Sequence, residues 1–480
     1  MTIDPDGFGR ILLLVSAVLL VAVFAARLSG RLGLPSLLLF LGLGLFIGEE
    51  GALGVEFDDT ELARILSFAA LILILAEGGL STRWDHVRRS MPLGIVLSTV
   101  GVAASTGVVA AFAHVVLGLD WRPALLLGAV TAATDAAAVF SVLRKVPLPR
   151  RISGALEAES GLNDAPTVLL VTLLSTAGTG APSGLALIGE VVRALALGAA
   201  IGLAAGWGGG WLVRRVGLPA SGPLAVAVFG FVVLAFGGAT VVHASGFAAV
   251  YVASLVLGNS GLPYRRTVLS FAEGLAWIAQ IGLFVMLGLL VWLDRIEPVE
   301  VLAALAVGLV LTFVARPLSV AISALPFRLP WRDQAFIAWA GLRGAVPIVL
   351  ATIALAEHGA LAQRVFDIVF VLVVVFTLLQ APTLPYVAKR LGLAEGGEHV
   401  DELDVEVAPL QLLDADLLEW RVVSGSHLIG VEISELHLPP GVSVAMLFRG
   451  GRPIDPSVET RLAVGDEVLV VAPVRLRQQT

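Results

Sequence analysis

Two short stretches place carboxylates inside segments that are otherwise apolar enough to lie in lipid. They are TAATDAAAVF at 131–140 and EAESGLNDAP at 157–166, which contain Asp135, Glu159 and Asp164. An ionisable side chain at membrane depth costs about 2.5–3.5 kcal/mol on the lenient insertion scale, so it usually marks an ion or proton pathway. The pattern predicts a membrane transporter of a small cation.

A third segment carries Gly341, Arg343, Gly344 and Pro347 within seven residues. Glycine and proline let a membrane helix unwind, which frees backbone groups at membrane depth. The segments around Asp135 and Arg343 fall in predicted spans that are seven apart, so the chain enters them from opposite faces. That is the relation expected between corresponding helices of an inverted repeat.

Residues 159–164 are expected to form one polar wall on a helix, because Glu159 and Asn163 are four residues apart and so are Ser160 and Asp164. A dehydrated K⁺ or Na⁺ needs oxygen ligands, which carboxylates, hydroxyls and carbonyls supply. Asp164 is the natural anionic ligand, with Ser160 beside it.

Two further oxygen donors are expected at the same site. Thr134 would contribute its hydroxyl or carbonyl, and Glu77 either joins the site or lies solvated at the membrane interface. A carboxylate in a low-dielectric cavity holds a proton more tightly, so cation and proton would compete for Asp164. Because Asn163 stands where a second acid could, we expect electroneutral one-for-one exchange.

The remaining charges in the predicted spans have other expected roles. Glu159 and Arg343 are predicted to form a structural ion pair, with direct ion handling as the alternative. Arg316, which precedes Pro317, is expected to extend its side chain to the cytoplasmic surface. No site role is expected for the remaining polar residues of the apolar runs, namely His243, Asn259 and Gln280.

The composition agrees with a polytopic membrane protein. Of 480 residues, 57% are hydrophobic and only 14% charged, whereas a soluble domain is about 25% charged. There is no cysteine, and the net charge of −7 argues against nucleic acid as a partner. We expect neither an enzyme nor a bound cofactor; the lipid bilayer, the transported cation and protons are the expected partners.

About 20 apolar residues cross a bilayer. By that rule the sequence predicts thirteen spans, near 10–29, 33–49, 60–80, 92–117, 122–143, 152–177, 184–213, 221–240, 243–259, 268–293, 299–324, 333–356 and 364–388. Arginine and lysine gather after the odd-numbered spans, whereas the other loops are acidic or nearly neutral. The positive-inside rule therefore places the N-terminus outside and the C-terminus in the cytoplasm of a bacterial inner membrane.

The composition changes after Leu393. We predict three parts: a transmembrane exchanger domain at 1–393, an acidic linker at 394–416 and a small folded cytoplasmic domain at 417–480. The last part has strand-like runs, and Gly450-Gly451 between two of them is a hairpin signal. So short a domain is expected to dimerise to complete its core.

At these residues the chain resembles the NhaP-type monovalent cation–proton antiporters of the CPA family. The resemblance covers roughly residues 10–390, and its most specific parts are Thr134-Asp135, the 159–164 string and the 341–347 segment. It implies an all-α fold with inverted repeats and two broken crossing helices. It also implies that Asp164, assisted by Ser160, Thr134 and Glu77, binds cation and proton.

The resemblance assigns two more roles and an assembly. Glu159 and Arg343 would be the family's structural ion pair, and Asp135 would compensate the facing half-helix ends. Spans four to six and eleven to thirteen would form a mobile core, and the other spans a scaffold through which a homodimer forms.

The tail, about 418–476, resembles the RCK_C (TrkA-C) regulatory domain, an α/β module that could bind an unidentified small-molecule regulator. No GxGxxG segment precedes it, so nucleotide binding by a Rossmann unit is not expected. Membrane domain and tail together are most similar to the potassium–proton antiporter subgroup that includes CvrA.

Three other functions are alternatives to potassium–proton exchange. A sodium–proton antiporter of the same fold fits the site residues equally well, so the potassium assignment depends on the domain architecture. A potassium channel would need a carbonyl filter such as TVGYG, and the sequence has none. A proton-coupled symporter for an organic solute would usually place aromatic or basic groups for the solute within the bundle.

Overall fold

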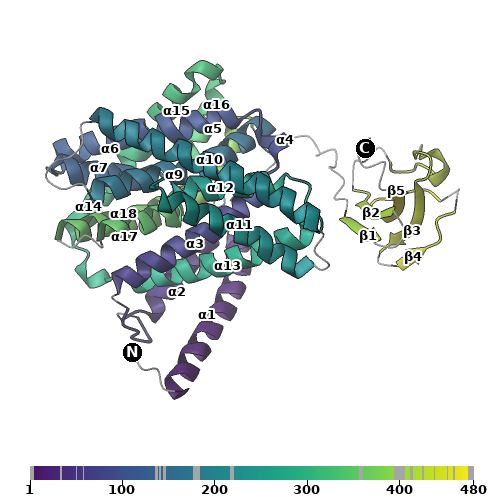
Figure 1. The fold of residues 1–480 in the computed structure, drawn as a ribbon, viewed down its shortest axis with the longest axis horizontal. Helices are drawn as coiled ribbons and strands as arrows, with labels where there is room; N and C mark the ends of the chain where they lie inside the picture. The colour runs from purple at the N-terminus through teal and green to yellow at the C-terminus, as the bar shows by residue number, and fades with distance from the viewer. Residues whose placement is uncertain are drawn as a thin grey trace. The chain divides into compact units, whose positions relative to one another are not determined.

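A computed structural model describes residues 5–32, 35–49, 51–57, 59–135, 139, 142–143, 148–176, 184–216, 221–355, 360–393, 406–410, 415–423, 426, 428–436, 438–450, 452–457 and 460–473. The chain forms two compact units, Met1–Ala394 and Glu395–Thr480. The first is helical and the second is built on a β-sheet (Figure 1).

The described part of the first unit is a bundle of α-helices. In chain order they are α1 (Pro5–Leu32), α2 (Ser36–Ile47), α3 (Thr60–Ser81), α4 (Trp84–Val87), α5 (Met91–Val96), α6 (Val102–Val116), α7 (Trp121–Ala132), α9 (Arg150–Thr176), α10 (Gly184–Val216), α11 (Ser221–Val241), α12 (Gly246–Gly258), α13 (Arg265–Leu289), α14 (Pro298–Val310), α15 (Arg316–Ala324), α16 (Trp331–Trp339), α17 (Ala345–Leu355), α18 (Ala360–Gln380) and α19 (Leu384–Arg390).

Seven helical stretches among the described residues are long and apolar enough to cross a membrane, and each overlaps a predicted span. Shorter apolar helices lie in the first, second and ninth predicted spans. The other three predicted spans correspond to α7, to α9 with its buried acids, and to α16 and α17, which a break separates. Carboxylates and helix breaks weaken the signal there, and the count of thirteen stays a prediction.

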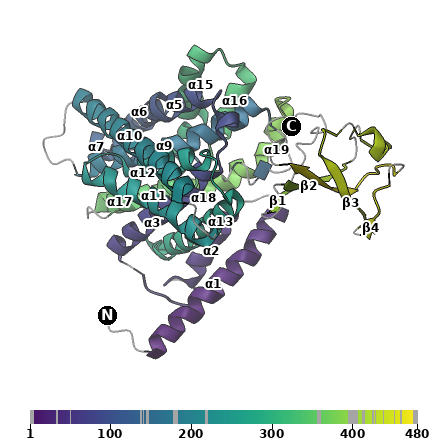
Figure 2. The same ribbon diagram turned by 45° about the vertical axis from the view of Figure 1, so that its right-hand side comes forward.

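The helices pack in two groups (Figures 1 and 2). Helices α2, α3 and α10–α13 pack on one another, and the close approach of α2 and α13 requires Gly44 and Gly288, where an added Cβ would collide with the opposite backbone. Helices α5–α7, α9 and α14–α18 form the second group. The second group holds the predicted spans four to six and eleven to thirteen, and both α9 and α17 also contact the first group.

Two π-helical turns interrupt long helices of the second group. Leu97–Gly101 joins α5 to α6, and Leu311–Ala315 joins α14 to α15. The second turn ends immediately before Arg316 and Pro317. Proline lacks an N–H and its ring clashes with the carbonyl four residues earlier, so a widened turn is a way to accommodate it without ending the helix.

The second unit is an antiparallel five-stranded sheet. Its strands are β1 (Glu406–Leu410), β2 (Ala415–Arg421), β3 (Ser443–Arg449), β4 (Arg452–Ile454) and β5 (Glu467–Pro473), in the order β1-β2-β5-β3-β4. The β3–β4 hairpin predicted at Gly450 is confirmed, since Arg449 pairs with Arg452 and Gly450 has a φ of 56°.

The described residues of this unit differ in two respects from what the sequence predicts. The predicted linker 394–416 contains β1, which pairs with β2 through five residues although its sequence is acidic and has a proline. An edge strand tolerates both features, because half of its backbone groups need no partner. The described residues of the unit contain no α-helix, only a 3-10 turn at Ile433–Glu435; Pro439 and Pro440 follow too closely for a longer helix.

A buried carboxylate stabilises the sheet unit beside its apolar core of Trp420, Val422, Leu447, Leu462, Val468 and Val470. The Asp466 side chain is inaccessible to solvent and accepts two hydrogen bonds of 2.8 Å from the Arg449 guanidinium. It also accepts one of 2.7 Å from the Ala463 N–H. The hydrogen bonds from Arg449 are the main reason that the pKa of Asp466 lies below its ordinary value.

We expect Asp466→Asn to destabilise this unit by about 2 kcal/mol at neutral pH, because it removes a charged partner of Arg449. Hydrogen exchange of the β5 amides in the full chain would then accelerate about 30-fold. Since the native pKa is depressed, the stabilisation is present above the unfolded carboxyl pKa of about 3.9 and disappears as pH falls through the native value. Exposed Asp455→Asn is the control; equal exchange in both variants contradicts the role of Asp466.

Candidate functional site

The site is built around two unwound segments that meet in the second helix group. Helix α7 ends at Ala132 and residues 133–135 are extended, while residues 340–344 separate α16 from α17. The Asp135 N–H donates a hydrogen bond of 2.9 Å to the Leu342 carbonyl, which joins the two segments. The predicted break around Arg343 is therefore present in the structure, and the chain beyond Asp135 lies largely outside the described residues.

Arg343 donates hydrogen bonds to the free carbonyl groups at the C-terminal end of α7. Its Nη1 donates to the carbonyls of Ala132 and Ala133 at 2.7 and 2.6 Å. These are carbonyls that a helix leaves without intrahelical partners, and they carry the negative end of the helix dipole. The Arg343 carbonyl in turn accepts a hydrogen bond of 2.8 Å from the Thr377 hydroxyl of α18. One buried residue thus links three helices.

A negative charge, the carboxylate of Asp135, lies at the start of α17. A Cβ added to Gly344 would collide with the carboxylate of Asp135, so this carboxylate lies directly against the residue that precedes α17. A negative charge next to a helix N-terminus is favourable, because the unpaired N–H groups there carry the positive end of the dipole. The predicted role of Asp135, compensation of a half-helix end, stays a prediction that this contact allows.

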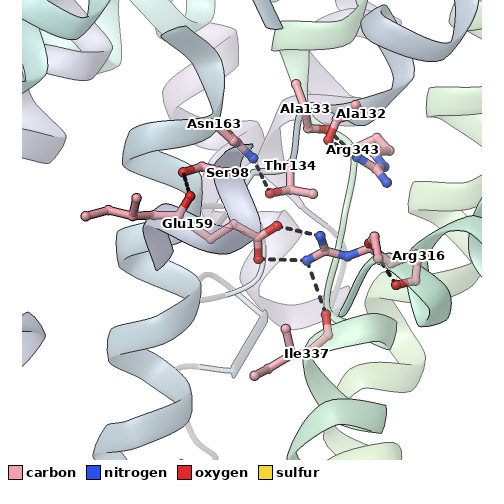
Figure 3. A network of polar contacts seen from close by, with 11 residues as sticks. Ser98, Ala132, Ala133, Thr134, Glu159, Asn163, Arg316, Ile337 and Arg343 are labelled. Carbon is pink, nitrogen blue, oxygen red and sulfur yellow. Dashed lines mark hydrogen bonds and ion pairs between the residues drawn. The ribbon is translucent and has the colours of Figure 1, made fainter. Parts of the chain in front are cut away.

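The predicted pair of Glu159 and Arg343 is wrong. Glu159 binds Arg316 instead, with Oε1 2.5 Å from Nη1 and Oε2 2.7 Å from Nη2 (Figure 3). Arg316 was expected at the cytoplasmic surface but is only 4% exposed. The π-helical turn precedes Arg316 directly, and Gly341 leaves room for its side chain: an added Cβ would lie 2.6 Å from Arg316 Nε. Arg343 is occupied by the end of α7.

Five of the predicted site residues line one cavity of about 460 Å³. They are Glu77 from α3, Thr134 and Asp135 from the extended segment, and Ser160 and Asp164 from α9. The cavity lies between the two helix groups, since its wall also includes residues of α12 and α13. The fold therefore brings five residues that the sequence singles out to the wall of one cavity.

Asn163 does not line the cavity but holds Thr134, which does. The side chain is fully buried, and its Nδ2 donates to the Thr134 hydroxyl at 2.6 Å (Figure 3). This bond ties the extended segment to α9. Among the described residues, Asp164 Oδ1 is buried and has no hydrogen-bonding partner. A buried acceptor without a donor is costly, so this oxygen is suited to receive a cation or a proton.

No group of three His, Asp or Glu side chains able to hold a resident metal ion occurs in the described part of the chain. The oxygen donors that line the cavity are the carboxylates of Glu77, Asp135, Glu157 and Asp164 together with hydroxyls such as those of Thr134 and Ser160. Such a set suits a transient monovalent cation.

Several cavity residues were missed by the sequence analysis. The same cavity is lined by Glu157, Thr82, Tyr251 and Gln280, the last of which was expected to have no site role. Glu157 had a readable signal, because it lies seven residues before Asp164 and so on the same face of α9. The others come from helices distant in sequence, so only the folded structure brings them to the site.

The comparisons with known proteins now identify the class. Residues 17–390 match the model of the sodium/hydrogen exchanger transmembrane family, and residues 417–477 match the TrkA-C domain. The chain belongs to the sodium/hydrogen exchanger family. It is a multi-pass membrane cation/proton antiporter with a C-terminal TrkA-C domain, and not an enzyme.

Individual members of the family show which antiporters this chain is similar to. The chain is 34% identical to the K⁺/H⁺ antiporter NhaP2 of Shewanella baltica, over 98% of this chain and 82% of that protein. It is 35% identical to the K⁺/H⁺ antiporter NhaP of Alkalimonas amylolytica, over 86% and 71%. A solved structure of the sodium proton antiporter MjNhaP1 from Methanocaldococcus jannaschii has the same fold, with a TM-score of 0.68, 23% identity and coverage of 78% and 99%.

The Glu159–Arg316 pair can be tested with a double-mutant cycle. Removing one partner of a buried pair costs about 3–5 kcal/mol, because the other charge stays buried and unpaired. We expect Glu159→Met and Arg316→Met each to lower the thermal unfolding temperature strongly, and the double variant to lose less than their sum. Coupling of Glu159 to Arg343→Met instead would contradict the assignment.

The packing of Asp135 against Gly344 gives a second test. We expect Gly344→Ala to displace the carboxylate and to reduce transport at least tenfold while the protein still reaches the membrane. Gly107→Ala is the matched control, because an added Cβ meets nothing within 4 Å there. Equal transport by both variants shows that the contact is dispensable.

Proposed function

We propose that the protein exchanges K⁺ for H⁺, one for one, across a bacterial inner membrane, with both ions competing for Asp164. The observation that carries the proposal is the buried, unpartnered Asp164 oxygen at the wall of a cavity lined by Thr134 and Ser160. A carboxylate there must be neutralised, and either a proton or a cation achieves this.

The neutral amide of Asn163 supports the stoichiometry. Nδ2 of Asn163 donates to the Thr134 hydroxyl. A carboxylate at position 163 could accept a hydrogen bond from that hydroxyl, but it would add a second charge to the site. With the amide in place, Asp164 carries one charge in each half-cycle, which makes the exchange electroneutral.

Potassium is proposed as the cation because the relatives aligned over nearly the whole chain, tail included, are K⁺/H⁺ antiporters. Sodium is the second candidate, since the chain is also 28% identical to the Na⁺/H⁺ antiporter NhaS2 of Synechocystis, over 82% of this chain and 72% of that protein. Oxygen ligands of the kind at Asp164 serve either ion.

The arrangement in the membrane is proposed from the charge pattern. Thirteen spans, an outside N-terminus and a cytoplasmic C-terminus follow from the basic residues after odd-numbered spans. The broken α7 and α16–α17 segments would be corresponding helices of an inverted repeat. The core group would move against the scaffold group, through which two copies of the chain would associate, and the TrkA-C domain would bind a small regulator.

Asp164→Asn tests the proposal in proteoliposomes that carry an imposed pH gradient. We expect K⁺ to dissipate the gradient in the wild type without sensitivity to voltage, and the variant to lose at least 100-fold because its amide cannot be protonated. Exposed Asp85→Asn is the control and choline the inert cation.

The possible results test the choice of cation and the exchange mechanism separately. A response to Na⁺ alone contradicts potassium as the substrate but agrees with exchange at Asp164. Full activity of Asp164→Asn overturns the site, and a voltage-sensitive response overturns one-for-one exchange.

A further inference from the structure

A second carboxylate faces the cavity from the same helix as Asp164. Ser153, Glu157, Ser160 and Asp164 all line the cavity from α9. Glu157 and Asp164 are seven residues apart, which is nearly two turns, so they lie on one face and about 10 Å apart along the axis. Glu157 is nearer to the end of α9 that begins with Arg150 and Arg151.

Glu157 is held at a defined position. The Thr82 hydroxyl lies 2.8 Å from Glu157 Oε1 and 2.7 Å from the Gly78 carbonyl, so these two acceptors share its one proton. Thr82 caps the end of α3, where its N–H donates to the Gly78 carbonyl, and its own carbonyl accepts 2.9 Å from Asn259 Nδ2. Within the described residues, no basic side chain lies within ion-pair distance of Glu157. A fixed carboxylate in a cavity without a basic partner attracts a cation.

A buried hydroxyl points to a ligand at the same place. Tyr251 of α12 is 3% exposed and lines the cavity. Its hydroxyl has no hydrogen-bonding partner of good geometry among the described residues, and Thr82 and Glu157 line the same cavity. Gly161 makes room for the ring, since an added Cβ would collide with it. An unsatisfied buried hydroxyl in the same cavity as a carboxylate offers a second oxygen to a cation or its water.

We propose that Glu157 and Tyr251 form an access site that receives a partly hydrated monovalent cation before it reaches Asp164. The inference rests on the proposed function. A cavity of about 460 Å³ has space for an ion with several waters at one end while Asp164 is protonated at the other. The access site raises the local cation concentration, so it sets the apparent KM and not the maximal rate or the stoichiometry.

Two variants distinguish the effect of the Glu157 charge on cation binding from the effect of its contact with Thr82. Glu157→Gln removes the charge but keeps an oxygen that accepts from Thr82. Thr82→Val removes the hydrogen bond and keeps the charge. A unit charge about 10 Å from Asp164 changes cation binding by about tenfold at an effective dielectric constant near 20.

The experiment measures K⁺-dependent dissipation of a pH gradient in everted membrane vesicles over a range of K⁺ concentrations. We expect Glu157→Gln to raise KM about tenfold with a maximal rate within about twofold of wild type. We expect Thr82→Val to raise KM only two- to threefold. Ser90→Ala, which removes another side-chain contact with α9, through the Arg151 carbonyl, is the control and should leave KM unchanged.

An unchanged KM in Glu157→Gln overturns the access site, and so does a larger KM effect in Thr82→Val, because a structural contact would then explain the result. Failure of the proposed function is recognised separately, by an active Asp164→Asn variant in the same vesicles. A fall in maximal rate with unchanged KM in Glu157→Gln also counts against the inference.

Discussion

The backbone crossing of residues 133–135 and 340–344 is the constraint on which the rest of the site depends. Unwound backbone inside a membrane is stable only when its polar groups find partners within the protein. Here Asp135 and Leu342 bond to each other, and Arg343 covers the open carbonyls of α7. The carboxylate of Asp135 lies where α17 begins. With both helix ends neutralised, Thr134 is held where it can face Asp164.

The buried pair of Glu159 and Arg316 lies outside this crossing and has a structural role of its own. Two ions taken from water gain little net stability from each other, but an unmatched one is expensive. Because Glu159 pairs with Arg316, Arg343 is left to bind the end of α7. The pair joins α15 to α9 and so fixes the helix that carries the proposed ion ligand.

The sequence predicted the polar segments well, because a carboxylate or a glycine–proline cluster stands out in an apolar chain. It placed Asp164 and Thr134 around what the structure describes as one cavity. It assigned the wrong arginine to Glu159, since the pairing depends on a π-helical turn before Arg316 that changes the helix register. It did not assign Glu157, whose place at the cavity depends on how α9 packs against α3 and α12. The edge strand β1 was read as linker for its acidic composition.

The claim that cation and proton compete for one carboxylate is tested most directly by proton release. K⁺ is added to the purified full-length protein in weakly buffered solution, and the liberated protons are counted with a pH indicator. One proton released per bound cation in the wild type, and none in Asp164→Asn, is the result that the account predicts. Cation binding without proton release, or release that persists in the variant, contradicts it.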